Sequence, residues 1–172
     1  MAITMHQLAV PVFTQYLLAL SANLDKAAAF CAGKKIDPSV LVNARLAPDM
    51  FPLSRQVQIA CDFAKGASAR LAGADVPAWA DDEKTFDELK ARIKKTLDFI
   101  AGLKADSFDG AETRDIKIKV RGNDVTFKGL PYLANYAMGH FYFHCTAAYA
   151  ILRHNGIELG KGDFIGKPPG MA

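Results

Sequence analysis

The sequence contains few cysteines and no recognisable export signal. Its three cysteines, Cys31, Cys61 and Cys145, are an odd number without paired spacing, which argues against a disulfide framework. The N-terminus lacks the basic region and the small-residue cleavage site of a signal peptide. We therefore expect a protein of a reducing compartment, the cytoplasm.

The sequence also has little excess of charge of either sign. The formal net charge is only +3, and acidic residues interleave most of the lysines and arginines. A nucleic-acid-binding protein typically gathers its basic residues on one face, so we expect no nucleic-acid partner.

The stretch from Met1 to Leu24 carries no charged side chain, but it is not a continuous hydrophobic run. Polar residues and Pro11 interrupt it, so it does not predict a membrane-spanning helix. Low charge is instead typical of a helix that is buried in a bundle or at a subunit interface. We therefore expect no membrane association, and we expect a homodimer.

Apolar residues recur at helical spacing in four segments. The predicted helices run from about Thr4 to Ala32, from Pro52 to Gly73, from a Thr85 cap through Ile100, and from Pro131 to about Asn155. Between Ile116 and Phe127 apolar and polar residues alternate around a turn at 122–124, which predicts a β-hairpin.

These elements predict an all-α fold, an antiparallel four-helix bundle with a small β-hairpin insert before the last helix. The chain length of 172 residues favours a single domain spanning 1–172. The glycine- and proline-rich tail, 158–172, is expected to be irregular and to run over the surface.

The most informative residues are His140 and His144, which lie within an uncharged segment of the last predicted helix. Four residues are about one helical turn, so both imidazoles leave the same face and could bind one metal ion. Tyr132 and Tyr136 extend this row and would place hydroxyl groups around the metal. The alternative is a core face whose polar atoms are satisfied by neighbouring helices. The glutamate of zinc proteases is absent, because Phe141 follows the first histidine.

A complete metal site needs about three protein ligands, so a third must come from another helix. The candidates are Gln56, Gln58 and Asp62 on the second long helix and His6 near the start of the first. We expect the histidine pair to face the bundle interior, within reach of one of the second-helix side chains.

Four blocks of the sequence are distinctive: 45–53, Gln56-Val57, 143–153 with Gly156, and 159–166. Together they resemble the DUF1993 family, which looks like a branch of the DinB-like four-helix bundles. The resemblance implies the bundle fold. It also implies a divalent metal held, as in members of the wider superfamily, by three histidines, one from the second helix and an HxxxH pair from the fourth. The pair falls on His140 and His144, but no histidine lies between His6 and His140 to match the second-helix ligand.

Two functions compete at this point. The first is a metal-dependent transferase or hydrolase with zinc, nickel or manganese at His140 and His144, where Tyr136 would orient a water or the substrate. The second is a non-catalytic dimeric bundle that binds a small molecule in a cleft without a metal. A nucleophilic pair of Cys145 with His144 is not expected, because consecutive helix residues point about 100° apart.

Overall fold

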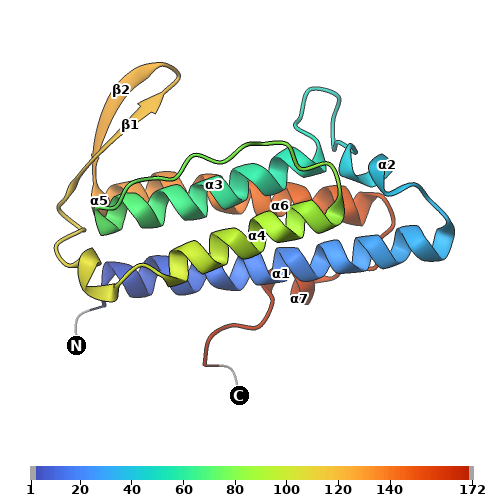
Figure 1. Ribbon diagram of the computed structural model, residues 1–172, viewed down its shortest axis with the longest axis horizontal. Coiled ribbons are helices and arrows are strands. Elements are labelled where there is room, and N and C mark those ends of the chain that lie inside the picture. The colour runs from blue at the N-terminus through green and yellow to red at the C-terminus, as the bar shows by residue number, and fades with distance from the viewer. Residues whose placement is uncertain (1–2, 171–172) are drawn as a thin grey trace.

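The computed structural model describes residues 3–170, and within them four long helices form a bundle (Figure 1). The helices are α1 (Met5–Lys34), α3 (Leu53–Ala72), α4 (Phe86–Ala101) and α6 (Met138–His154). The predicted four-helix bundle is therefore confirmed. Among residues 3–170 no helix is long and apolar enough to cross a membrane.

Local capping signals set most of the helix ends. Thr4 and Thr85 each begin a helix with a capping box, in which the hydroxyl accepts from the backbone three residues later. Gly73 ends α3 in the left-handed conformation at φ 67°. Helix α1 continues two residues beyond the predicted end at Ala32, to Lys34, and Lys35 adopts the left-handed conformation at φ 54°.

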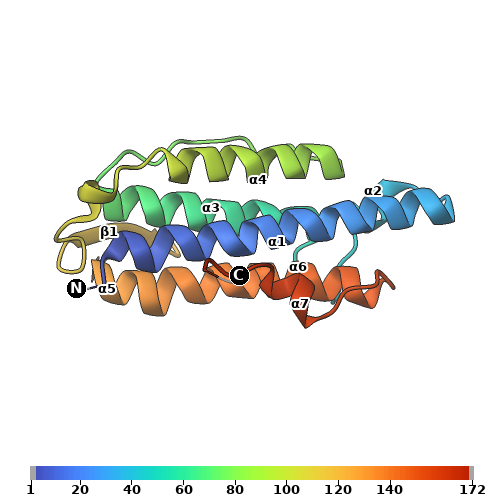
Figure 2. The same ribbon diagram turned by 90° about the horizontal axis from the view of Figure 1, so that it is seen from below.

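The four helices surround one apolar core. Figure 2 shows α4 and α6 at opposite edges of the bundle, with α1 and α3 between them. The segment 73–85 returns along the length of the bundle, so α4 runs in the same direction as α3, whereas α1 and α6 run the opposite way (Figure 1). Each long helix contributes fully buried side chains to the core, among them Phe13, Leu17, Leu53, Leu71, Leu89, Ile93, Phe141 and Ile151.

The chain after α6 is more ordered than expected. The tail was predicted to be irregular, but it contains the short helix α7 (Lys161–Ile165), which lies against α1. Gln15 of α1 donates to the Ile165 carbonyl at 2.9 Å, and the Phe164 ring packs edge-on against Tyr16 and Tyr149. Contacts with aromatic residues that are distant in the sequence thus order this segment. The local sequence of the tail does not predict such contacts.

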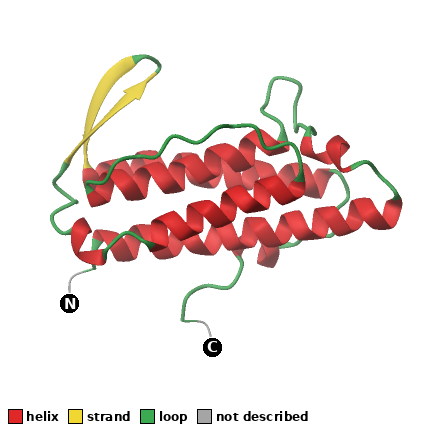
Figure 3. Cartoon of the chain, viewed as in Figure 1, coloured by secondary structure: helices red, strands yellow, loops and turns green. Residues whose placement is uncertain are grey.

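Two strands form the expected hairpin, which projects from one end of the bundle (Figure 3). Strand β1 (Asp115–Val120) pairs antiparallel with β2 (Asn123–Lys128), and Val120 lies opposite Asn123. The turn is therefore Arg121-Gly122, one residue earlier than the sequence predicted. Both turn residues have positive φ, 51° and 85°, as a two-residue type I′ turn requires.

The last helix is irregular at its beginning. A single turn, α5 (Gly129–Pro131), leads into the π-helical segment η2 (Tyr132–Ala137), and α6 follows without a break. The Met138 amide donates to the Leu133 carbonyl five residues back, which is the π-helical pattern. Two further short elements, α2 (Pro38–Val42) and η1 (Ala105–Phe108), lie in the connections.

Candidate functional site

A row of rings runs along one face of η2 and the first turn of α6. Tyr132 stacks on Tyr136 with centroids 5.9 Å apart, and Tyr136 lies 4.4 Å from the His140 ring. The sequence predicted this row from the spacing of four residues. It did not predict that the two tyrosines belong to a π-helical segment, a feature that occurs often at functional sites.

His140 lies at the surface, so the expectation that it faces the bundle interior is wrong. Its Nδ1 atom is 2.8 Å from the Tyr136 carbonyl oxygen, one turn earlier. A carbonyl can only accept, so Nδ1 carries the proton and donates. The Nε2 atom of His140 therefore presents a free lone pair.

His144 is buried, as expected, and contacts the second long helix. Its Nδ1 atom is 2.7 Å from Gln56 Oε1, while Gln56 Nε2 donates to the Phe51 carbonyl at 3.0 Å. That second bond fixes the orientation of the amide, so Oε1 accepts and the His144 Nδ1 donates. Burial, together with the neighbouring His140 and the positive charge of Arg55, lowers the pKa of His144 to about 4, so the imidazole is neutral at pH 7.

Two other expected ligands on α3 bind protein groups instead. Gln58 donates to Glu83 at 2.9 Å. The Asp62 carboxylate lies 2.9 Å from both the Arg92 guanidinium and the Lys65 ammonium. Two cations therefore already neutralise the one carboxylate that could have joined the histidines.

The described donors do not fit the three-ligand metal centre that the superfamily implies. His6 packs edge-on against Phe108, with ring centroids 5.2 Å apart. Within residues 3–170 no three His, Cys, Asp or Glu side chains come together as a group able to hold a metal ion. The Gln56 amide oxygen accepts a hydrogen bond from His144 Nδ1, so it is on the side of the ring opposite the Nε2 atom that would bind a metal. The described part of the chain thus supplies a pair of histidines and no third imidazole or acidic ligand.

An apolar ring from α3 faces the histidine pair. Phe63 stacks on His140 with centroids 4.6 Å apart and an interplanar angle of 21°, and it lies 6.2 Å from His144 at 17°. The sequence does not single out Phe63, because this residue lies outside the apolar stripe that marks the core face of the helix. Its ring continues the aromatic row from α6 onto α3.

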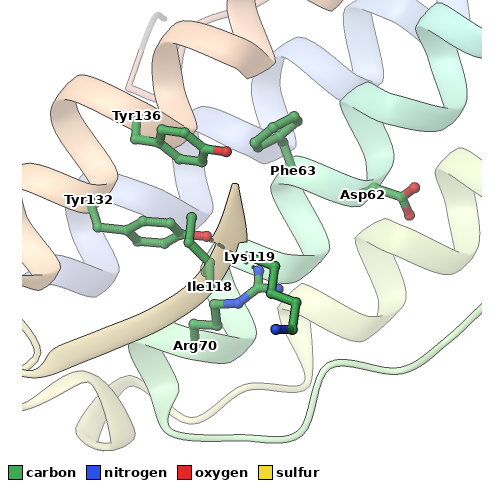
Figure 4. A pocket seen from close by; sticks show the side chains of 7 residues that line it. All are labelled: Asp62, Phe63, Arg70, Ile118, Lys119, Tyr132 and Tyr136. Atoms are coloured by element: carbon green, nitrogen blue, oxygen red, sulfur yellow. Dashed lines mark hydrogen bonds between the residues drawn. The ribbon is translucent and has the colours of Figure 1, made fainter. Parts of the chain in front are cut away.

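A pocket of about 350 Å³ opens beside this row, between α3, η2 and the hairpin. Figure 4 shows Phe63 and Arg70 projecting into it from α3, Tyr132 and Tyr136 from η2, and Ile118 and Lys119 from β1. Asp62 completes the lining. The pocket thus combines aromatic faces, two phenolic hydroxyls and two basic side chains.

A sequence signal for the α3 wall of this pocket exists, but it is weak. Phe63 and Arg70 are seven residues apart, or about two helical turns, and therefore lie on the same face. Gly66 lies between them in the helix interior, where glycine usually has a packing or functional reason. The hairpin wall has no such signal, because its position over the bundle is a matter of tertiary structure.

The cysteines are not part of the site. All three are buried and free. Burial raises the pKa of the Cys61 thiol to about 12 and raises the pKa of Cys145 as well. Both thiols are therefore protonated at neutral pH and are poor nucleophiles.

The same fold occurs in a solved structure of a DinB family member. The crystal structure of a DinB family member from Shewanella denitrificans matches with a TM-score of 0.90 and 43% sequence identity, over 97% of this chain and 94% of that chain. The profile of DUF1993, a domain of unknown function, matches residues 5–165, and the chain belongs to this family. No curated protein matches the sequence.

Proposed function

We propose that this protein binds a small organic molecule in the pocket between α3, η2 and the hairpin. The observation that carries the proposal is the lining: the rings of Phe63, Tyr132 and Tyr136 border a cavity of about 350 Å³. Small-molecule sites typically have volumes of about 300–1,000 Å³, apolar walls and a few polar groups that fix orientation. The non-catalytic alternative from the sequence is thus the better supported one.

The aromatic lining favours a planar ligand. A flat ring can stack on Phe63 or Tyr136 and gain about 0.5–1.5 kcal/mol beyond the area that it buries. The phenolic hydroxyls can donate to or accept from the edge of the ligand. His140 adjoins Tyr136 and offers a further acceptor at Nε2.

Saturation-transfer NMR with a panel of phenol, benzoate, benzamide and benzylamine tests the proposal. We expect at least one of the four to bind the wild-type protein. Binding should weaken in Phe63→Leu, which keeps the bulk of the side chain and removes the ring. The matched control is Phe143→Leu, because Phe143 is 57% exposed on α6 and does not line the pocket. Absence of binding by all four compounds, or equal loss in both variants, would contradict the proposal.

A metal-dependent transferase or hydrolase is the second candidate, and one observation favours it. Both histidines donate through Nδ1 to an oxygen and leave Nε2 free, as metal-binding histidines do. Water would have to fill the remaining positions around an ion held by His140 and His144.

Titration calorimetry with zinc, nickel and manganese tests this second candidate. If the pair holds an ion, His140→Ala should weaken binding by about tenfold or more. Weak binding that this substitution leaves unchanged would remove the metal site from consideration.

We also propose a homodimer that forms through α1 and the start of the last helix. An apolar groove lies between these elements, with Leu8 and Val12 on one side and Leu130, Leu133 and Met138 on the other. Leu8 and Leu130 are 39% and 45% exposed, which is high for large apolar residues. A second copy would cover this surface and account for the uncharged N-terminal part of α1.

A further inference from the structure

The guanidinium of Arg70 lies in the pocket without an acidic partner. Its Nη1 donates to the Tyr132 hydroxyl at 3.3 Å. No carboxylate of residues 3–170 lies within 4.0 Å of it, although the structure contains ion pairs to other arginines. A guanidinium has five N–H donors, and that of Arg70, which is half-buried, donates to one neutral acceptor among the described residues. Its remaining donors can bind an anion.

The backbone of α3 makes room for this guanidinium. A Cβ atom at Gly66 would lie 2.5 Å from Arg70 Nη1, so the side chain folds back over the glycine. Glycine in a helix interior costs about 1 kcal/mol relative to alanine. The position of Arg70, on the pocket side of the helix, therefore depends on a residue that is locally unfavourable.

The other charged side chains that line the pocket are paired with opposite charges, so the charge of Arg70 makes the pocket positive. Lys119 of β1 lines the same cavity, and its ammonium lies 2.8 Å from Asp124 at the solvent-exposed turn. Asp62 is the only carboxylate in the described lining, and it contacts both Arg92 and Lys65 at 2.9 Å. The acidic group is neutralised by two cations, whereas Arg70 retains its full charge.

We infer that the pocket binds a planar organic anion, an aromatic carboxylate, with its ring on Phe63 and Tyr136 and its carboxylate on Arg70. This inference rests on the proposed small-molecule function and specifies the class of ligand. The guanidinium suits a carboxylate, because its planar fork can donate two parallel hydrogen bonds to the two oxygens.

Benzoate and benzamide distinguish charge from shape, because the two are nearly isosteric and differ in charge. We expect the wild-type protein to bind benzoate about tenfold or more tightly than benzamide, as a hydrogen-bonded ion pair requires. In Arg70→Gln this preference should disappear while benzamide binding remains. The matched control is Arg153→Gln, which removes an exposed arginine at the end of α6 and should leave the preference unchanged.

Gly66→Ala gives an independent test that does not remove the charge. The new methyl group would displace the guanidinium, so benzoate affinity should fall severalfold while benzamide affinity stays the same. Because alanine favours the helix, the melting temperature should not fall, and a loss of binding cannot then be attributed to unfolding. Circular dichroism melts check this point.

The possible failures are distinguishable. If neither benzoate nor benzamide shifts the amide resonances of pocket residues, both the small-molecule function and the ligand class are wrong. If both compounds bind equally and Arg70→Gln has no effect, the pocket binds aromatic molecules but the anion inference is wrong.

Discussion

His144 is neutral because its surroundings oppose a charge. The ring is 8% exposed, donates to Gln56, and lies close to the positive charge of Arg55. An imidazole in water has a pKa near 6.5, so the folded protein binds this proton less readily than the unfolded chain does. Stability should therefore depend on pH in the acid range.

The first prediction is a loss of stability as the pH falls from about 6.5 to about 4. The contribution of His144 to the free energy of unfolding is fully present above pH 6.5. It decreases at lower pH, because the unfolded chain binds a proton at this imidazole and the folded protein does not until the pH nears 4. With a folded-state pKa of about 4, the total loss is at most about 3 kcal/mol. Urea unfolding between pH 7 and pH 4 measures it.

His144→Gln is the matched variant, because it keeps a polar side chain and removes the titrating group. Its free energy of unfolding should depend less on pH than that of the wild type over the same range. Identical pH dependence in both proteins would show that His144 does not titrate as described.

The residue-level pattern of the site was only partly visible in the sequence. The row of Tyr132, Tyr136, His140 and His144 follows from spacing along one helix, and the contact of His144 with the second long helix follows from the inward projection of such residues in bundles. The exposure of His140 and the stacking of Phe63 depend on how two helices pack, which no local pattern specifies. The metal at the pair stays a prediction.

At the scale of elements, one buried arginine holds the long connection 73–85 against the bundle. The Arg92 side chain is 1% exposed and contacts Asp62 and Asp81 at 2.9 Å and Glu83 at 3.0 Å. It also donates to the Ala80 carbonyl at 2.7 Å. These contacts join α4, α3 and the connection, and they explain why Asp62 is not free to ligate a metal.

The second prediction is that Arg92→Ala destabilises the fold by about 3 kcal/mol, because it leaves partly buried carboxylates without a partner. The control is Lys94→Ala on the same helix. Lys94 and Asp98 form an exposed pair, so its loss should cost less than about 0.5 kcal/mol. Equal effects of the two substitutions in chemical denaturation would contradict the role assigned to Arg92.

The hairpin turn contains a residue that is poorly suited to it. Arg121 adopts φ 51°, a left-handed conformation that asparagine and glycine adopt more readily. The third prediction is that Arg121→Asn stabilises the hairpin by about 1 kcal/mol, since Asn-Gly is favoured in type I′ turns. Hydrogen exchange of the β1 and β2 amides should slow by about fivefold.

Arg121→Ala provides the control for this turn, because it removes the long side chain but keeps the left-handed strain. It should leave exchange of the hairpin amides unchanged. If alanine protects these amides as well as asparagine does, the effect comes from the loss of arginine and not from the turn conformation.

Elements with strong local signals were predicted well. Thr85 with Glu88 marked the start of α4, and Gly73 marked the end of α3, because caps are local interactions. The π-helical segment η2 and the tail helix α7 were missed. The helix α7 is too short to be stable alone and depends on its packing against α1.

At the scale of the whole molecule, two exposed leucines, Leu8 and Leu130, meet in the groove between α1 and the start of the last helix. Leu18 of α1 is also 53% exposed. The fourth prediction is that the protein sediments as a dimer of 18.6-kDa chains at tens of micromolar. A charge placed in the groove, as in Leu8→Glu, should shift it toward the monomer.

The control for the assembly is Val40→Glu, because Val40 is 58% exposed on α2 and lies outside the groove. This variant should sediment as the wild type does. A wild-type protein that sediments only as a monomer would contradict the proposed dimer and leave the ligand pocket unaffected.

The position of a bound ligand tests the central claim most directly. Diffraction from crystals soaked in benzoate should show the ring against Phe63 and Tyr136 and the carboxylate at Arg70, in the pocket bordered by the hairpin. A pocket that stays empty in benzoate, or benzoate bound with its carboxylate away from Arg70, would contradict the claim.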